Sequence, residues 1–253
     1  MQLITERASH WYKHLGGGTV EPCYEMPKKD GKGMKAVTLR EARELNLFPS
    51  VTTILSVLNK PALNDWRVEQ GIMAALTLPR LDNEPIDGFA HRVVKDMDSQ
   101  SSVARDFGTE IHKGIENLLT RPGYEVEPAI EPFIQSFAQW SCAEVQEVHG
   151  AELCVGDPTC GFAGKLDLDC TLRGIGRAVV DVKSQRIKDK PIYYPEWVLQ
   201  LAAYRQCRIL AEDEPFACVS AVIDSTKPGP IHVKLWEDPD SAWVAFVHAL
   251  SLW

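Results

Sequence analysis

The apolar residues of this chain change from a helical spacing to a two-residue spacing near residue 150. Before that point they recur every three or four positions, as in Phe107, Ile111 and Ile115, which is the spacing of one helix face. After it, the stretch from Lys165 to Leu172 alternates polar and apolar residues strictly, as a strand with one buried face does. A chain with both patterns needs helices packed on a sheet, so we predict an α/β or α+β fold.

The same patterns predict the individual elements. Helices are expected from Ser50 to the stop at Pro61 and over 39–46, 62–78, 85–97, 99–120, 128–147, 195–211 and 239–251, and strands over 151–155, 165–172, 178–183, 216–223 and 230–236. Residues 1–49 are rich in Gly, Pro and charge and are expected to be irregular, with turns at 16–18 and 28–33. We therefore divide the chain into an irregular segment 1–49, a helical lobe 50–127 and a core 128–253, packed as one compact unit.

Composition limits the function classes. The 253 residues include 35 acids and 27 Lys and Arg, which gives a formal charge of −8. A surface this acidic does not bind nucleic acid over its whole extent, but it is compatible with a local basic groove. No apolar run approaches the roughly 20 residues of a membrane span, and the N-terminus lacks the apolar core of a secretory signal. We expect a cytoplasmic protein with no membrane partner; a phage-encoded protein in a host or an organellar one also fits.

The seven cysteines are scattered and form no C-x-x-C pair. An odd, scattered set matches neither a secreted disulfide framework nor a zinc ribbon. We expect free, mostly buried thiols.

Two carboxylates and a lysine are predicted to meet where two strands pair. Asp181 and Lys183 lie two residues apart on one strand and so project from the same face, roughly 6.5–7 Å apart. Asp167 lies on the preceding strand, which a short glycine turn joins to this one, so the two strands are expected to pair antiparallel. Carboxylate oxygens suit Mg²⁺ or Mn²⁺, and a nearby lysine can orient an attacking water and offset phosphate charge.

Four motifs occur in a recognisable order: Gly-x-x-x-His on a helix, Gly-x-x-Asp and Asp-x-Lys on strands, and Gln-x-x-x-Tyr on the next helix. They are residues 108–112, 164–167, 181–183 and 200–204. This order resembles the PD-(D/E)XK nuclease superfamily, and within it the RecB-like exonuclease branch that includes mitochondrial genome maintenance exonuclease and phage-encoded members. The resemblance covers about residues 100–210, with 49–53 as a further point of likeness.

The resemblance implies a restriction-endonuclease-like core, with a mixed central sheet flanked by helices and an N-terminal helical elaboration. It also implies roles for individual residues. The metal ligands would be Asp167, Asp181, His112 and the backbone carbonyl of Val182. Lys183 would position the water, and Gln200 and Tyr204 would brace Lys183 or contact the DNA backbone. Two further acids near the site would be Glu152 and Glu116. The implied reaction is metal-dependent hydrolysis of a phosphodiester that leaves a 5′-phosphate.

Candidate DNA contacts follow the Asp-x-Lys strand. The loop after Lys183 carries cations and aromatic rings, namely Arg186, Lys188, Lys190, Tyr193 and Tyr194. The cations can neutralise phosphates and the rings can stack on bases. Trp11 and Tyr12 are candidates for the same stacking. The alternative for the loop is a solvated segment with no ligand.

Each feature also has an ordinary structural explanation. Asp167 and Asp169 can form the solvated face of an edge strand, Asp181 and Lys183 a surface ion pair, and His112 a structural contact. The chain has neither the late cysteine cluster that holds an iron–sulfur centre in some RecB-like nucleases nor a phosphate-loop motif. We therefore expect no iron–sulfur cluster and no motor of its own.

The function predicted from these residues is a Mg²⁺- or Mn²⁺-dependent DNA exonuclease. We expect it to act on single-stranded ends in recombination, repair or replication, with proteins of those processes as possible partners. The helices over 50–120 are expected to arch over the site and thread the strand. The first alternative is an inactive nuclease-fold subunit that binds DNA or assembles with other proteins, and the second is a small-molecule hydrolase.

Overall fold

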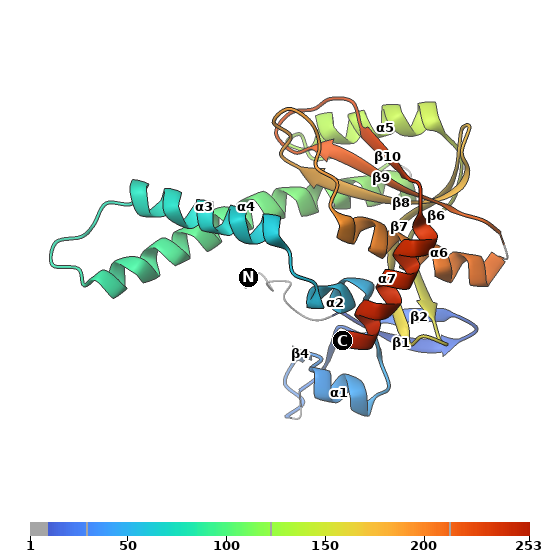
Figure 1. Cartoon of the computed structure of the whole chain (residues 1–253), viewed down its shortest axis with the longest axis horizontal. Helices are drawn as coiled ribbons and strands as arrows, with labels where there is room; N and C mark the ends of the chain where they lie inside the picture. The colour runs from blue at the N-terminus through green and yellow to red at the C-terminus, as the bar shows by residue number, and fades with distance from the viewer. Residues whose placement is uncertain (1–9, 29, 122, 213) are drawn as a thin grey trace.

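A five-stranded mixed sheet forms the centre of the molecule, with helices on both of its faces (Figure 1). The computed structural model describes residues 10–28, 30–121, 123–212 and 214–253, with the backbone alone for 100–105. In sheet order, the strands are β10 (His232–Trp236), β9 (Ala217–Asp224), β8 (Gly176–Gln185), β7 (Phe162–Leu172) and β6 (Val145–Asp157). Strands β8 and β9 are parallel and joined by α6 (Pro195–Glu212), whereas the other neighbours pair antiparallel.

Two apolar layers hold the helices on the sheet. The helices involved besides α6 are α4 (Ile86–Thr120), α5 (Glu131–Glu144) and α7 (Pro239–Leu252). Helices α4 and α5 cover one face, where Val180 and Phe137 are buried, and α6 and α7 cover the other, where Val179 and Phe246 are buried. Because consecutive residues of β8 are buried on opposite faces, this strand is dry on both sides. The mixed α/β architecture predicted from the sequence is confirmed.

Strand β7 lies inside the sheet, so the interpretation of its polar residues as the solvated face of an edge strand is wrong. Asp169 is fully buried. The strand also departs from simple alternation, because Leu166 packs in the layer beneath α6 and α7 whereas Leu168 packs in the layer beneath α4 and α5. Asp167 lies at this change of side.

Residues 10–49 form a small β module, so the prediction of an irregular segment is wrong for the described part of it. Its elements are β1 (Trp11–Gly16), β2 (Thr19–Pro22), β3 (Glu25–Pro27), β4 (Met34–Ala36), α1 (Leu39–Glu44) and β5 (Phe48–Pro49). The expected turns at 16–18 and 28–33 join β1 to β2 and β3 to β4. Strands of two to six residues are too short for alternation to reveal them. A bridge from Ser50 to Ala163 attaches the module to β7.

Trp11 and Tyr12 are core residues of this module, so the expectation that they are open to bases is wrong. Both are only 2% exposed. The Trp11 indole donates a hydrogen bond to the carbonyl of Val37.

The helices differ from the sequence prediction at two places in the helical lobe and at one in the core. The helices expected over 85–97 and 99–120 are one continuous helix, α4, of 35 residues. The helix from Ser50 is instead a short α2 (Val51–Ile54) and a 3-10 turn (Leu55–Val57), and α3 (Pro61–Thr77) follows close to its expected bounds. The helix expected to reach 147 ends at Glu144, and β6 begins at once instead of at 151.

The expected arch over the sheet is not formed. Helix α3 and the first half of α4 pair as a long hairpin that projects away from the sheet (Figure 1). Only the second half of α4 reaches the core, where Ile111 and Ile115 are buried. The lobe therefore contributes one packed helix to the core and one projecting arm.

The seven cysteines are all free, and Cys170, Cys207 and Cys218 are buried. The other four are intermediate or exposed, so the expectation of mostly buried thiols is wrong. In the described residues, no helix combines the length and apolar character needed to cross a membrane.

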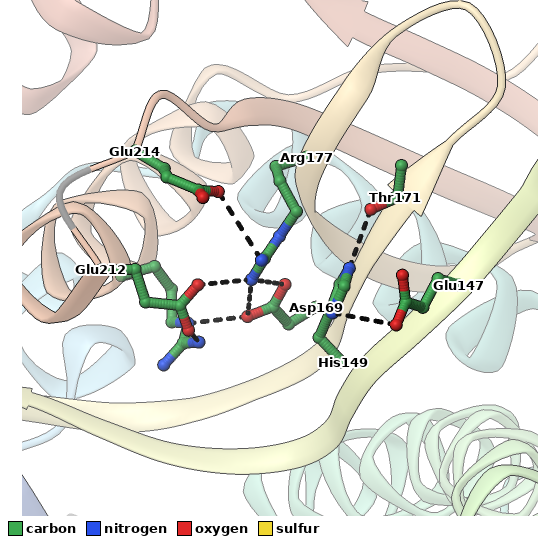
Figure 2. Close-up of polar contacts among 8 residues, drawn as sticks. Glu147, His149, Asp169, Thr171, Arg177, Glu212 and Glu214 are labelled. Carbon is green, nitrogen blue, oxygen red and sulfur yellow. Dashed lines mark hydrogen bonds and ion pairs between the residues drawn. The ribbon is translucent and has the colours of Figure 1, made fainter.

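A buried ion network ties the end of α6 to the sheet (Figure 2). The carboxylate of Asp169 accepts hydrogen bonds from Arg177 on β8 at 3.0 Å and from Arg208 on α6 at 2.7 Å. Glu212 pairs with both arginines, and Glu214 lies 3.7 Å from Arg177. The acid is fully buried and neutralised, so this network is a structural clamp and not an open site.

We predict that Asp169→Ala destabilises the protein by about 3–5 kcal/mol, because it leaves two largely buried guanidinium groups without their shared carboxylate. Urea unfolding followed by circular dichroism measures the loss. The exposed Asp189 gives the control, since Asp189→Ala is expected to stay within about 0.5 kcal/mol of the wild type. Equal stability of the two variants would contradict the assignment of the network as a clamp.

Candidate functional site

The candidate site lies where strands β7 and β8 stop pairing. Their antiparallel ladder ends at Leu168 and Val180, so the next residues, Asp167 and Asp181, lie side by side. Beyond this point the two strands are joined by a side-chain hydrogen bond in place of the backbone pairs. Asp167 Oδ2 accepts it from the amide of Val182 at 2.7 Å. The two predicted carboxylates are thus brought together.

Lys183 connects these carboxylates to helix α6. Its Nζ donates to Asp181 Oδ1 at 2.7 Å and to Gln200 Oε1 at 3.2 Å, and Gln200 Nε2 donates to the Tyr204 hydroxyl at 3.3 Å. The pair formed by Asp181 and Lys183 is not a surface ion pair, since Asp181 is 1% exposed. Gln200 and Tyr204 therefore brace Lys183, as one of the two expectations for them states.

Gly164 allows Tyr204 to reach this position. A Cβ atom added at Gly164 would lie 2.5 Å from the Tyr204 ring, closer than any real side chain packs. The ring thus lies directly on the backbone of β7. Burial raises the pKa of Tyr204, so its hydroxyl stays neutral and serves as a hydrogen-bonding group.

His112 approaches from the opposite layer on α4. Gly108, one turn earlier, allows the helix to lie against β8, because a Cβ there would be 2.6 Å from Ser184 Oγ. Burial and the charge of Lys183 lower the pKa of His112, whereas the charge of Asp181 opposes the shift. The imidazole is therefore neutral at pH 7, which is the form that binds metals.

Burial shapes the electrostatics of the two carboxylates. It raises the pKa of Asp167 and of Asp181 to about 6, and Lys183 partly offsets this effect in both. Burial lowers the pKa of the Lys183 ammonium, but the two carboxylates raise it more, so this pKa lies above the usual value for lysine. The cluster thus holds two acids that one cation does not fully stabilise.

The donor set fits a divalent cation. Asp181 Oδ2 is buried without a hydrogen-bond partner in the described part of the chain, and buried carboxylate oxygens normally have one. With the side chains as they stand, no three His, Cys, Asp or Glu residues of the described ranges are grouped closely enough to hold an ion. The carboxylate and carbonyl oxygens suit Mg²⁺ or Mn²⁺, and His112 would add one imidazole nitrogen to them.

Glu152 and Glu116 belong to a second charge cluster at the edge of the site. Glu152 lies on β6 with a left-handed backbone, φ 55°, which is strained for a residue with a side chain. Its carboxylate forms an ion pair with Lys165, and Glu116 of α4 lies 4.0 Å from the same ammonium. Glu116 also pairs with Lys113 at 2.6 Å, and the charge of Glu152 acts on both His112 and Asp167.

In the loop after β8 the Lys and Arg side chains are exposed to solvent, whereas the two tyrosine rings pack against other aromatic residues. Arg186, Lys188 and Lys190 are solvent-exposed, in a loop closed by two hydrogen bonds between Gln185 and Ile192. The rings of Tyr193 and Tyr194 pack edge-on against Trp197, and Tyr193 also contacts Trp236. The cations stay predicted phosphate contacts, whereas the tyrosines form part of an aromatic cluster.

A cleft beside the site was not predicted from the sequence. It has a volume of about 830 Å³ and is lined by Lys165, Gln200 and Tyr204 of the core together with residues of the N-terminal β module. His10 and Tyr24 of that module carry no motif and lie far from the core in sequence. Only the folding of the module onto β7 reveals them.

Comparisons with known proteins add no assignment. No protein-family model matches the chain, and no curated protein matches it at a significant level.

We predict that Asp167→Asn stabilises the metal-free protein at about pH 8 and has little effect at about pH 4.5. The pKa of an aspartate in the unfolded chain is near 4, below the value of Asp167 in the folded protein. Between about pH 4 and 7 the folded protein therefore binds more protons at Asp167 than the unfolded chain does. The free energy of unfolding falls in this range as pH rises, because the folded state must give up that proton. The asparagine oxygen still accepts from Val182.

Thermal unfolding in EDTA across this pH range measures the difference, with Asp189→Asn as the exposed control. A difference in unfolding temperature between Asp167→Asn and the wild type that stays constant with pH would contradict the raised pKa of Asp167.

Proposed function

We propose that this protein is a Mg²⁺- or Mn²⁺-dependent nuclease that hydrolyses DNA phosphodiester bonds. The observation that carries the proposal is the meeting of Asp167, Asp181 and Lys183, with one buried oxygen of Asp181 left without a partner. The resemblance of the four sequence motifs to PD-(D/E)XK nucleases supports the same function. The exposed cations of the loop after β8 support a polyanionic substrate.

Each side chain has a role in this proposal. Asp167, Asp181, His112 and the carbonyl of Val182 would hold the cation, which supplies a Lewis acid for the phosphate and a more acidic bound water. The Lys183 ammonium orients the attacking water and offsets the negative charge that develops on the phosphate. Gln200 fixes Lys183, and Tyr204 fixes Gln200, so the ammonium is positioned before substrate arrives.

The alternative is a nuclease fold that binds DNA without cleaving it. The intact set of carboxylates and lysine argues against this alternative, because a chain that no longer catalyses has no need to bury Asp181 and Lys183 together. Calorimetric titration with Mn²⁺ separates the two: binding that is lost in Asp167→Asn favours the enzyme.

We predict that Lys183→Met lowers hydrolysis of an end-labelled oligonucleotide by about 10²–10⁴-fold, the range for a positioned proton-transfer or charge-stabilising group. Asp181→Asn is expected to lose activity to background. Gel analysis with Mg²⁺, Mn²⁺ or EDTA gives the rates.

Lys227→Met changes an exposed lysine between β9 and β10 and is the matched control, with wild-type rates expected. Metal-dependent cleavage that survives in both Lys183→Met and Asp181→Asn would overturn the site assignment.

We further predict that linear single strands are cut from their ends and that covalently closed circles are resistant. Because Asp181 and Lys183 are largely buried, a strand end reaches them with less distortion than an internal bond of a circle does. A time course of equal masses of linear and circular strands measures both rates, and comparable rates would mean an endonuclease.

A further inference from the structure

One wall of the cleft beside the site belongs to the core. Lys165, Gln200 and Tyr204 line it there, and Gln200 is the residue that contacts Lys183. The hydroxyl groups of Ser50 and Thr52 complete this part of the wall. The cleft therefore continues directly from the place where a phosphate would be hydrolysed.

The wall that the N-terminal module forms is aromatic. The rings of His10 and Tyr24 are stacked, with centroids 4.7 Å apart and planes 28° from parallel. Tyr12 meets Tyr24 edge-on, and the Tyr24 hydroxyl donates to the Tyr12 hydroxyl at 3.0 Å. Tyr12 is 2% exposed and thus fixed in the core of the module, so the stacked rings are a preorganised platform.

The charges around the cleft favour a neutral ligand group. The Lys165 ammonium is paired with Glu152 and lies 4.0 Å from Glu116, and Glu25 of the N-terminal module adds a further carboxylate to the wall. A neutral, flat group therefore suits the aromatic wall.

We infer that this cleft binds an unpaired nucleobase of the DNA strand being cleaved, stacked on the rings of His10 and Tyr24. The strand backbone then passes Gln200, which contacts Lys183, so the stacked base lies next to the scissile bond. This inference rests on the proposed nuclease function and deepens it, because it assigns the substrate as single-stranded next to the scissile bond. The volume is within the roughly 300–1,000 Å³ of small-ligand sites.

Single-stranded substrate follows from the nature of stacking. A base in a duplex has both faces covered by its neighbours and cannot stack on a protein ring without leaving the duplex. Stacking on an aromatic ring is possible for every base, so the cleft is expected to select unpaired strands without selecting sequence.

The experiment measures binding of a fluorescently labelled single strand of about 12 nucleotides to the full chain in EDTA, where hydrolysis does not occur. We expect His10→Ala and Tyr24→Ala each to weaken binding about 5- to 100-fold, the range for loss of one stacked base. His10→Phe and Tyr24→Phe keep a ring and are expected to retain most of the affinity. His14→Ala is the matched control, because His14 stacks on Phe48 in the same module and does not line the cleft.

Strands with a single abasic position, moved from each end inward, identify the bound base. When the missing base is the one that the cleft binds, the wild type is expected to bind the abasic strand as weakly as His10→Ala binds the intact strand. Combining the abasic position with His10→Ala is then expected to cause no further loss of affinity. Additive losses at every position, or full affinity in both alanine variants, would overturn the inference.

A parallel assay with Mn²⁺ separates this inference from the proposed function. If the wild type cleaves and His10→Ala cleaves with an unchanged KM, the cleft assignment fails while the nuclease stands. A higher KM with a similar kcat supports the inference. If the wild type neither binds nor cleaves single strands, both fail.

Discussion

The meeting of the buried Asp181 with the partly buried Asp167 and Lys183, at the point where β7 and β8 separate, is the constraint around which the site is built. Desolvation raises the pKa of both carboxylates, and Lys183 only partly offsets this effect. Such an arrangement costs stability and persists only where the surrounding sheet and helices fix it. A divalent cation would remove the cost, which is why incomplete neutralisation points to function.

The same sheet contains the opposite case. Asp169 is also buried, but two arginines satisfy it fully and tie α6 to the strands. Helix α6 serves both clusters from residues four apart: Gln200 and Tyr204 brace Lys183, and Arg208 binds Asp169. Full neutralisation makes Asp169 a structural clamp, whereas the unpartnered oxygen of Asp181 leaves the other cluster open to a ligand.

Two glycines set the distances within the site. Gly108 brings α4, and with it His112, onto β8, and Gly164 brings the Tyr204 ring onto β7. A larger residue at Gly164 would displace the Tyr204 ring, and one at Gly108 would meet the Ser184 hydroxyl of β8. The sequence motifs that begin with these glycines thus have a direct steric meaning.

The sequence by itself indicated most helices and strands of the core and the carboxylates and lysine that β7 and β8 bring together. Long periodic stretches and the two-residue spacing of Asp181 and Lys183 are local properties, and local patterns reveal them. The tertiary structure alone decided the rest: that β7 is an interior strand, that α4 is one helix with a projecting half, and that Trp11 and Tyr12 are core. It also placed His10 and Tyr24 beside Lys165, because contacts between residues about 150 positions apart depend on packing and leave no periodic signal in the chain.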